Sequence, residues 1–400
     1  MTAGHTPLMR EVRDGNAAAL LQRLVLDGPA ARKQLGRSTG LSLTTITRLV
    51  SGLVDGGVLY ELPARPVGGE PGRAGRPETP LGFVPGGRVV VGTHLREASA
   101  TSSVFDLDGT CTASFTVPCQ DPGPEQGVAA AIAATERALA STAPGRVLGL
   151  GVSTDGVIDP RTGVVVDSPH PGWRNADLRT PFAPLGPRVR VGGSVHCLAL
   201  DALWRGQVPR TDTFLMVLVA NVVASALVVG RSPLSGPDTS AGQIAHLPVR
   251  NGPGVLCPCG ATDCLGVVAT DRALHARAVE RGLLAPATPW ADVLRDDLDT
   301  AEGLRALRLE RARFLGESVA TLNAFCNPEA TVIAGSLGTE EEVEVCLSTA
   351  RSHAVRIGAG TLTRVEHRPV RRSTWDRASA ALVLDDFLRR PTSYVAALLD

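Results

Sequence analysis

Residues 63–87 divide the chain into two parts of different character. This stretch reads PARPVGGEPGRAGRPETPLGFVPGG, and 13 of its 25 residues are proline or glycine. Proline removes a backbone donor and glycine has no side chain to pack, so we do not expect a long helix or a buried strand here. We predict that this stretch is a flexible wing and linker at the end of a first domain, residues 1–85, and that a second domain follows at residues 86–400.

The second part alternates apolar, strand-like runs with helical stretches. The expected strands are Arg88–Val91, Ser102–Asp106, Val147–Val152, Arg188–Val191, Phe214–Val219 and Thr331–Ala334. The expected helices are Glu125–Ala140, Val195–Arg205 and Ala301–Asn327. Alternation of this kind predicts an α/β body.

The segment Thr213–Gly230 is almost uncharged and about long enough to span a bilayer. It is rich in β-branched residues, however, and Asn221 and Ser225 interrupt it. Basic flanks and an aromatic belt are both missing. We therefore expect two buried strands joined by a tight turn near Ala220, and no membrane segment.

Charge and cysteine content narrow the class of protein. The chain has 40 Arg and Lys residues against 40 Asp and Glu, so only a local basic surface can indicate a nucleic-acid partner. Residues 1–13 are polar and lack the apolar core of a secretory signal. Eight cysteines, three of them within residues 257–264, favour cytosolic thiols and a metal site over a disulfide framework. We expect a cytoplasmic protein.

The N-terminal part has the pattern of a helix-turn-helix. Helices are expected at residues 17–26, 30–39 and 43–55, with Gly40 in the tight turn and Ser42 as the N-cap of the third helix. Apolar residues recur at the i, i+3, i+4 and i+7 positions of the third helix, which predicts that this face packs on the first two helices.

The opposite face of the third helix and the segment after it carry groups that suit DNA. Short hydroxyls near a helix N-terminus can approach bases and phosphates, and an arginine one turn on can reach a guanine. Strands expected at Val58–Leu62 and Leu81–Phe83 would form a wing with arginines between them. The predicted DNA contacts are Arg32, Ser42, Thr44, Thr45, Thr47, Arg48, Arg73 and Arg76. The alternative is a three-helix bundle used for packing, since residues 1–80 carry only ten Arg and Lys against seven Asp and Glu.

Four residues are spaced as metal ligands. His246, Cys257, Cys259 and Cys264 form the pattern H-x10-C-x-C-x4-C. Three thiolates and one imidazole complete a tetrahedral set that suits structural Zn²⁺ and leaves no open position for catalysis. The alternative is a loop of free cysteines. The other five cysteines, including Cys111, are expected in the core.

These segments resemble the ROK family (repressors, open reading frames, kinases). The resemblance is carried by residues 28–61, by GRP at 75–77, and by AGQIAHLPV and LCPCGATDCLG in the cysteine segment. It implies a winged helix-turn-helix followed by a two-lobed actin/hexokinase-like (ribonuclease H-like) body. The small lobe would comprise residues 86–190 and 376–400, and the large lobe residues 191–375.

The kinase motifs of that family are altered here. The first phosphate loop, Asp-Gly-Gly-Thr in the family's kinases, corresponds to Gly92–Ala98, where His94 replaces the acid and Arg96 and Glu97 replace the glycines. Side chains at those positions keep backbone amides from a phosphate, and Glu97 would repel it. The second phosphate loop corresponds to residues 220–225, which contain no glycine.

The family's catalytic Asn-Asp pair corresponds to Gly193 and Ser194, and a serine hydroxyl cannot act as a general base at neutral pH. Two sugar-binding acids correspond to Gln243 and Gly266. We therefore predict no kinase activity. By the resemblance, a cleft for a sugar-like effector would use Trp173, Ser194, Gln243 and His246. Asp155 and His196 are further candidates to line it. The pocket could instead take a modified or phosphorylated sugar, or no ligand.

The sequence thus predicts a transcriptional regulator, favoured as a repressor. A homodimer or tetramer would place two recognition helices on a double-stranded DNA operator, and an effector in the body would shift their placement. Two alternatives stay open, namely an active sugar kinase with an added DNA-binding module and a DNA-binding or scaffold protein without an effector.

Overall fold

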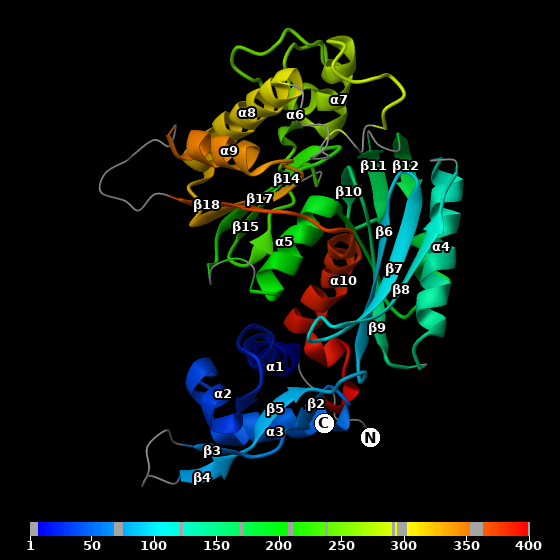
Figure 1. Cartoon of the computed structure of the whole chain (residues 1–400). Helices are drawn as coiled ribbons and strands as arrows, with labels where there is room; N and C mark the ends of the chain where they lie inside the picture. The colour runs from blue at the N-terminus through cyan, green and yellow to red at the C-terminus, as the bar shows by residue number, and fades with distance from the viewer. Residues whose placement is uncertain are drawn as a thin grey trace.

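The computed structural model of the chain has an N-terminal helical module below a two-lobed body (Figure 1). It describes residues 7–67, 75–120, 123–143, 145–168, 172–206, 208, 211–236, 239–289, 293, 302–352 and 363–398.

Three helices and a small sheet form the N-terminal module. The helices are α1 (Pro7–Asp27), α2 (Arg32–Thr39) and α3 (Leu43–Asp55), and the strands β1 (Ala30–Ala31), β5 (Pro80–Phe83) and β2 (Leu59–Glu61) form a sheet in that order. The core of the module is apolar and fully buried, with Leu20, Leu21, Leu35, Ile46 and Leu53 at its centre. Three helices follow one another here, with Gly40 in the turn between the second and the third, which is consistent with the predicted helix-turn-helix.

Two boundaries differ from the sequence prediction. The first helix begins already at Pro7, because its first turns pack on the C-terminal end of the chain, which the local sequence does not reveal. The second helix begins only at Arg32, because Ala30 and Ala31 pair with Leu81 and Pro80 of β5.

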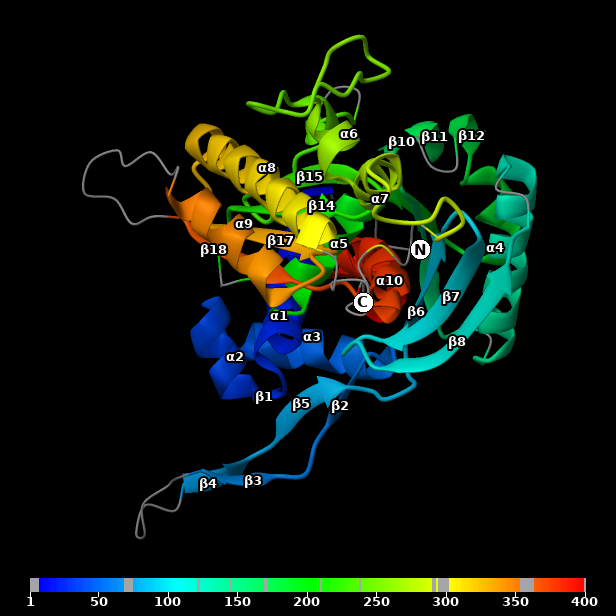
Figure 2. The ribbon, with the colours of Figure 1, turned by 45° about the horizontal axis from the view of Figure 1, so that its top comes forward.

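The wing is more regular than a flexible linker. Strands β3 (Arg65–Val67) and β4 (Gly75–Glu78) form an antiparallel pair in which Arg65 faces Glu78. Figure 2 shows this hairpin projecting from the module, away from the body. Proline is tolerated here because the hairpin has two strands, and both are edges that can leave a donor position unpaired.

The first lobe is a five-stranded sheet between two helices. Its order is β13 (Val189–Gly193), β9 (Val147–Thr154), β6 (Val89–Leu95), β7 (Ser99–Asp106) and β8 (Cys111–Pro118). Helix α4 (Pro124–Ala140) covers one face and α10 (Arg372–Arg389) the other (Figure 1). Helix α10 lies directly on the strand backbones, since a Cβ atom on Gly151 would come within 1.9 Å of the Ser379 carbonyl oxygen.

A small antiparallel sheet extends this lobe. It consists of β10 (Val157–Asp159), β11 (Val164–Ser168) and β12 (Trp173–Asp177), and the 3-10 helix η1 (Thr180–Leu185) leads back to β13. Strand β13 pairs with β9 as far as Gly193, and α10 begins at Arg372. Both elements therefore cross the lobe boundaries expected at residues 190 and 376.

The second lobe contains the other five-stranded sheet. Its order is β16 (Ser232–Pro233), β15 (Val223–Val229), β14 (Phe214–Val219), β17 (Ala330–Gly335) and β18 (Arg364–Arg368). Helix α5 (Ser194–Trp204) packs on the face toward α10, and α8 (Glu302–Cys326) and α9 (Glu340–Ser352) lie on the opposite face. The short helices α6 (Leu265–Ala269) and α7 (Asp271–Glu280) close the upper end of the lobe (Figure 1).

The apolar segment Thr213–Gly230 forms the antiparallel strands β14 and β15, as predicted. Among the described residues, no helix combines the length and hydropathy needed to cross a bilayer. One prediction about the cysteines is wrong: Cys111 is exposed, because it begins the edge strand β8, whereas Cys197 and Cys346 are buried as expected.

Candidate functional site

The N-terminus of α3 is fixed by its cap. Ser42 has extended backbone angles, and its hydroxyl accepts a hydrogen bond from the backbone N–H of Thr45 at 3.1 Å. The same hydroxyl lies 2.9 Å from the Thr45 hydroxyl, and the Thr47 hydroxyl donates to the Leu43 carbonyl oxygen at 2.8 Å. The bond from Thr45 satisfies one of the backbone donors that a helix N-terminus otherwise leaves free, and the helix begins at the residue that the sequence predicts.

The predicted contact face of α3 lies at the surface. Ser42, Thr44, Thr47 and Arg48 are exposed and Thr45 is half-buried, whereas Ile46, Leu49, Val50 and Leu53 are buried in the core. The helix therefore presents hydroxyls and one guanidinium together, beside the projecting wing.

The other predicted contacts are placed differently. Arg32 forms an ion pair with Glu61 of β2, with 2.7 Å between Nη2 and Oε1, so its guanidinium is already engaged within the module. Arg76 lies on wing strand β4, and Arg73 lies outside the described residues.

The four predicted metal ligands come together. Their ligand atoms all lie within 4.8 Å of one another. Cys257 Sγ is 3.5 Å from His246 Nδ1, and Cys259 Sγ is 3.6 Å from Cys264 Sγ. Tetrahedral zinc with bonds of about 2.3 Å to sulfur and about 2.0 Å to nitrogen separates its ligand atoms by roughly 3.5–3.8 Å. The donor set and the spacing thus fit one metal ion.

A residue that sequence analysis missed shapes this loop. The carboxylate of Asp263 accepts hydrogen bonds from the N–H groups of Gly254 (2.8 and 3.0 Å) and Val255 (2.8 Å). The backbone of Asp263 has a φ of +55°, which an aspartate tolerates better than most residues. Asp263 therefore helps to fold the loop that brings Cys257 and Cys264 within 4.8 Å of each other. The only sign of this role in the sequence is that Asp263 directly precedes the ligand Cys264.

The four predicted effector contacts do not share one environment. Trp173 is 2% exposed and packs into the first lobe against Gly127 of α4, so little of its ring is available to a ligand. Ser194 is buried at the first turn of α5, beside Asp155. Burial raises the pKa of the Asp155 carboxyl. Gln243 and His246 are exposed in one turn of the second lobe, and His246 belongs to the metal cluster.

A packed histidine occupies the position of the first phosphate loop. His94 is 3% exposed, stacks on Trp375 with 5.1 Å between ring centroids, and has Nδ1 2.8 Å from the Ser153 hydroxyl. Burial, reinforced by Arg96, lowers the pKa of His94 to about 3, so the imidazole is neutral. The turn that follows carries Glu97, which forms an ion pair with Arg272 of α7.

The second phosphate-loop position is a closed turn. Val219 pairs with Val223, and the N–H of Ala220 donates to the Val222 carbonyl oxygen at 2.9 Å. The carbonyl oxygen of Ala220 in turn accepts from the N–H of Asp271. The N–H and carbonyl groups of Ala220 are therefore both bonded within the protein.

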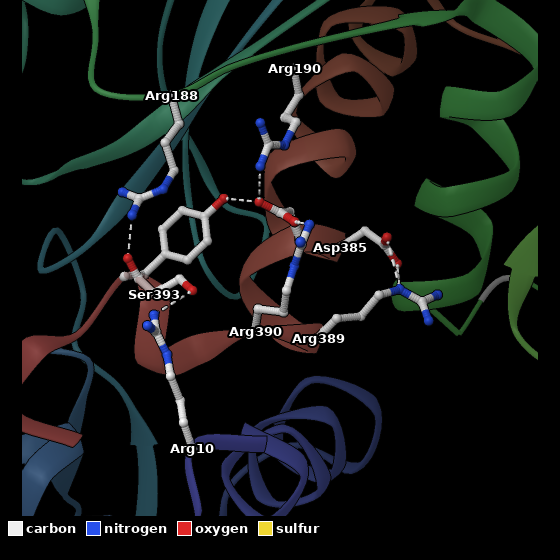
Figure 3. Close-up of polar contacts among 9 residues, drawn as sticks. Arg10, Arg188, Arg190, Asp385, Arg389, Arg390 and Ser393 are labelled. Atoms are coloured by element: carbon white, nitrogen blue, oxygen red, sulfur yellow. Dashed lines mark hydrogen bonds and ion pairs between the residues drawn. The ribbon is translucent and has the colours of Figure 1, made fainter. Parts of the chain in front are cut away.

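The junction between the N-terminal module and the body was not foreseen from the sequence. After α10 the chain forms two 3-10 turns, η5 (Pro391–Ser393) and η6 (Ala396–Leu398), which contact α1 and α3. Gln22 of α1 donates to the Leu388 carbonyl oxygen at 3.1 Å, and Arg10 donates to the Ser393 hydroxyl at 3.3 Å (Figure 3). On α3, a Cβ atom at Gly56 would come within 2.4 Å of Val395.

Asp386 of α10 is the centre of this junction. Its carboxylate accepts from Arg190 of β13 at 2.6 Å and from the Tyr394 hydroxyl at 2.5 Å, and it also binds Arg390 (Figure 3). Burial alone would raise the pKa of Asp386, but the Tyr394 hydroxyl and Arg190 outweigh it, so the pKa is lowered. Arg188 stacks over the Tyr394 ring, 4.2 Å from its centroid. Strand β13, helix α10 and the C-terminal segment are thereby joined at one carboxylate.

Comparison with known proteins shows which family the body of the chain belongs to. A model of the ROK family matches residues 92–380. The chain belongs to the ROK family. The transcriptional regulator Rv0485 of Mycobacterium tuberculosis is 30% identical to it over 368 residues, which cover 86% of this chain and 80% of that protein.

Two crystal structures share the fold. A ROK family transcriptional regulator, a homologue of the Escherichia coli MLC protein, superposes with a TM-score of 0.75 and 17% identity, covering 98% of this chain and all of that one. The ROK hexokinase of Thermus thermophilus superposes with a TM-score of 0.60 and 24% identity, covering 74% of this chain and 97% of that one. The predicted α/β fold, with an N-terminal module on a two-lobed hexokinase-like ROK body, is confirmed.

Proposed function

We propose that this ROK protein is a DNA-binding transcriptional regulator, favoured as a repressor, that works in the cytoplasm. The observation that carries the proposal is the capped, exposed N-terminus of α3 beside a projecting wing. In the major groove, the hydroxyls of Thr44, Thr45 and Thr47 and the guanidinium of Arg48 would reach base edges or phosphates. Ser42 would orient the helix, and Arg32, Arg73 and Arg76 would follow the phosphate backbone.

The operator is expected to be an inverted repeat. A homodimer or a tetramer built from dimers carries two copies of α3 related by two-fold symmetry, and a symmetric DNA site matches that arrangement. Sedimentation of the purified chain distinguishes monomer, dimer and tetramer.

We further propose that the body has no kinase activity. Glu97 would place a negative charge where a phosphate must bind, and Ser194 stands where the family's kinases have a catalytic acid. The ion pair of Glu97 with Arg272 of α7 supports the absence of kinase activity, because it keeps the Glu97 side chain at the first phosphate-loop position. ATP-dependent phosphorylation of any hexose by the purified chain would overturn this part of the proposal.

We assign structural Zn²⁺ to the cluster of His246, Cys257, Cys259 and Cys264. Four protein donors fill a tetrahedral shell, so the ion would cross-link the loop before α6 and leave no site for a reacting water. Ser194 and Gln243, two of the residues that the family resemblance implies, remain our candidates for contacts with a sugar-like effector.

Genome-wide footprinting tests the central proposal. We expect discrete promoter sites that contain an inverted repeat, and an Arg48→Ala variant should occupy them more weakly. If the purified wild-type chain bound no promoter fragment at low salt, where phosphate contacts are strongest, the assignment as a DNA-binding regulator would be wrong.

A further inference from the structure

The first residue of α3 is an exposed leucine. Leu43 is 52% exposed, whereas Leu49 and Leu53, which hold the same helix to the module, are 4% and 0% exposed. A single exposed leucine is common on protein surfaces. The position of Leu43 distinguishes it, since this residue stands at the N-terminus of the helix that we propose to enter DNA. Its apolar surface is therefore available to the partner of that helix.

The hydroxyl groups around Leu43 are already bonded within the helix. The Thr47 hydroxyl donates to the Leu43 carbonyl oxygen at 2.8 Å. The Thr45 hydroxyl lies 2.9 Å from the Ser42 hydroxyl, which also accepts from the Thr45 backbone N–H at 3.1 Å. A hydroxyl proton that is bonded in this way cannot be donated to a base at the same time. Apolar groups therefore make up more of the contact surface than the number of threonines indicates.

This end of α3 also lacks negative charge. Residues 42–54 contain neither Asp nor Glu, and the first acid of the helix is Asp55, its last residue. Acids are favourable in the first turn of most helices, because the N-terminus carries a partial positive charge. Here an acid would repel the phosphates of a DNA partner. Without one, the tip can approach the groove closely enough for van der Waals contact.

Thymine is the base that suits an apolar side chain in the major groove. It presents a C5-methyl group there beside its O4 acceptor, whereas the other bases present hydrogen-bond donors and acceptors. A side chain without donors or acceptors can therefore recognise thymine through its methyl group.

We propose that Leu43 is a specificity-determining residue whose side chain packs on the C5-methyl group of a thymine in the operator. This inference rests on the DNA binding proposed above, and it adds a base pair that is read without a hydrogen bond. Leu43 and Arg48 are five residues apart, which is about 7.5 Å along the helix. That distance is roughly two base-pair steps, so we expect the thymine within about three base pairs of the Arg48 contact.

A protein partner would need the same surface. Leu43 lies beside Thr44 and one turn from Thr47, and both threonines are exposed. A protein that covered Leu43 would therefore also cover the DNA contact face, and the two interactions would exclude each other. The absence of acids at the tip favours DNA as the partner.

The test begins with an operator that the full wild-type chain selects at low salt from a duplex library of random sequence. Each thymine of a half-site is then replaced singly by deoxyuridine, which pairs with adenine in the same way but lacks the C5-methyl group. Fluorescence anisotropy gives the Kd of each duplex. From the transfer free energy of one methyl group, we expect at least one replacement to raise Kd about four-fold. If none of them raised the Kd of the wild type, the proposal would be overturned.

A double-mutant cycle assigns the contact to Leu43. We expect Leu43→Ala to bind the thymine operator more weakly than the wild type, and to bind the thymine and deoxyuridine duplexes with equal Kd. Alanine is a good helix former and the lost groups are half exposed, so Tm should stay close to that of the wild type. Leu43→Met keeps an apolar side chain and should keep the preference for thymine. If Leu43→Ala kept the wild-type ratio of the two Kd values, another residue would contact the methyl group and the assignment would be wrong.

Val54→Ala is the matched control. Val54 is a second exposed apolar residue of α3, with 40% exposure, and it lies eleven residues after Leu43. It is about 16 Å from the tip of the helix, too far to contact the same base pair. We expect this variant to keep the wild-type preference for thymine. Loss of the preference in Val54→Ala would contradict a specific contact by Leu43.

The outcomes separate this proposal from the function on which it rests. If the wild-type chain selected no sequence, the assignment as a DNA-binding regulator would fail, and the thymine contact with it. If the chain selected an operator but bound the deoxyuridine duplexes equally well, the regulator would stand and only the thymine contact would be refuted.

Discussion

The carboxylate of Asp14 on α1 accepts two hydrogen bonds from Thr392, one from the backbone N–H at 2.9 Å and one from the hydroxyl at 2.7 Å. The two residues are 378 positions apart in the chain. The first helix of the DNA-binding module is therefore bound to the last described turns of the body.

Removing that carboxylate should loosen the junction. We expect Asp14→Ala to lower the free energy of unfolding by about 1–3 kcal/mol, because two donors of Thr392 lose their acceptor. Urea denaturation followed by circular dichroism measures the effect. Asp14→Asn keeps one acceptor oxygen and should lose less. Equal urea midpoints for Asp14→Ala and the wild type would show that the contact contributes nothing.

Arg48 should contribute to sequence-specific binding. Replacing it with alanine is expected to weaken operator binding by about 1–3 kcal/mol, roughly 5- to 150-fold, if its guanidinium binds a guanine. Fluorescence anisotropy at several salt concentrations separates a base contact from a phosphate contact, because losing a phosphate contact also reduces the salt dependence. Arg137→Ala, an exposed arginine on α4 of the body, is the matched control and should leave affinity unchanged.

The metal cluster should stabilise the second lobe. We expect purified protein to contain about one zinc per chain and a chelator to lower Tm, since the ion joins His246 to the cysteine loop. Cys257→Ser should lose the metal by elemental analysis. Cys111→Ser changes an exposed cysteine far from the cluster in sequence and should retain it. Full zinc content in Cys257→Ser would contradict the ligand assignment.

His94 should make stability depend on pH below neutrality. Its pKa falls from 6.5 to about 3 in the folded chain, so the unfolded state binds a proton at a pH where the folded state does not. The contribution is fully present above pH 6.5 and is lost progressively as the pH falls toward 3. Between pH 6.5 and 5, this amounts to about 2 kcal/mol.

The measurement compares unfolding free energies of the wild type and His94→Asn at several pH values. The difference between them should shrink as the pH is lowered from 7 to 5, because only the wild type carries this titrating group. A difference that stays constant over this range would show that His94 is not buried as a neutral imidazole.

Sequence analysis identified the elements whose determinants are local. The bounds of α3 follow from the Ser42 cap and the apolar spacing, and strands β14 and β15 follow from a β-branched run broken at Asn221. The metal cluster follows from ligand spacing within residues 246–264. In each case the deciding residues lie in one continuous stretch of about 20 residues or fewer, so the signal is present in the local sequence.

Contacts between segments that are far apart in the chain leave no signal in any single stretch of sequence. The start of α1 at Pro7, the junction of Asp14 with Thr392 and the joining of Arg190, Asp386 and Tyr394 depend on how α10 lies across the first sheet. Trp173 was predicted to contact an effector. Its burial was likewise decided by packing against α4. The sequence by itself determined the helix-turn-helix, the strands and the metal ligands, because periodicity, capping and ligand spacing are local properties. Only the tertiary structure decided how the module is attached to the body, because that attachment depends on side chains that meet only after the whole chain has folded.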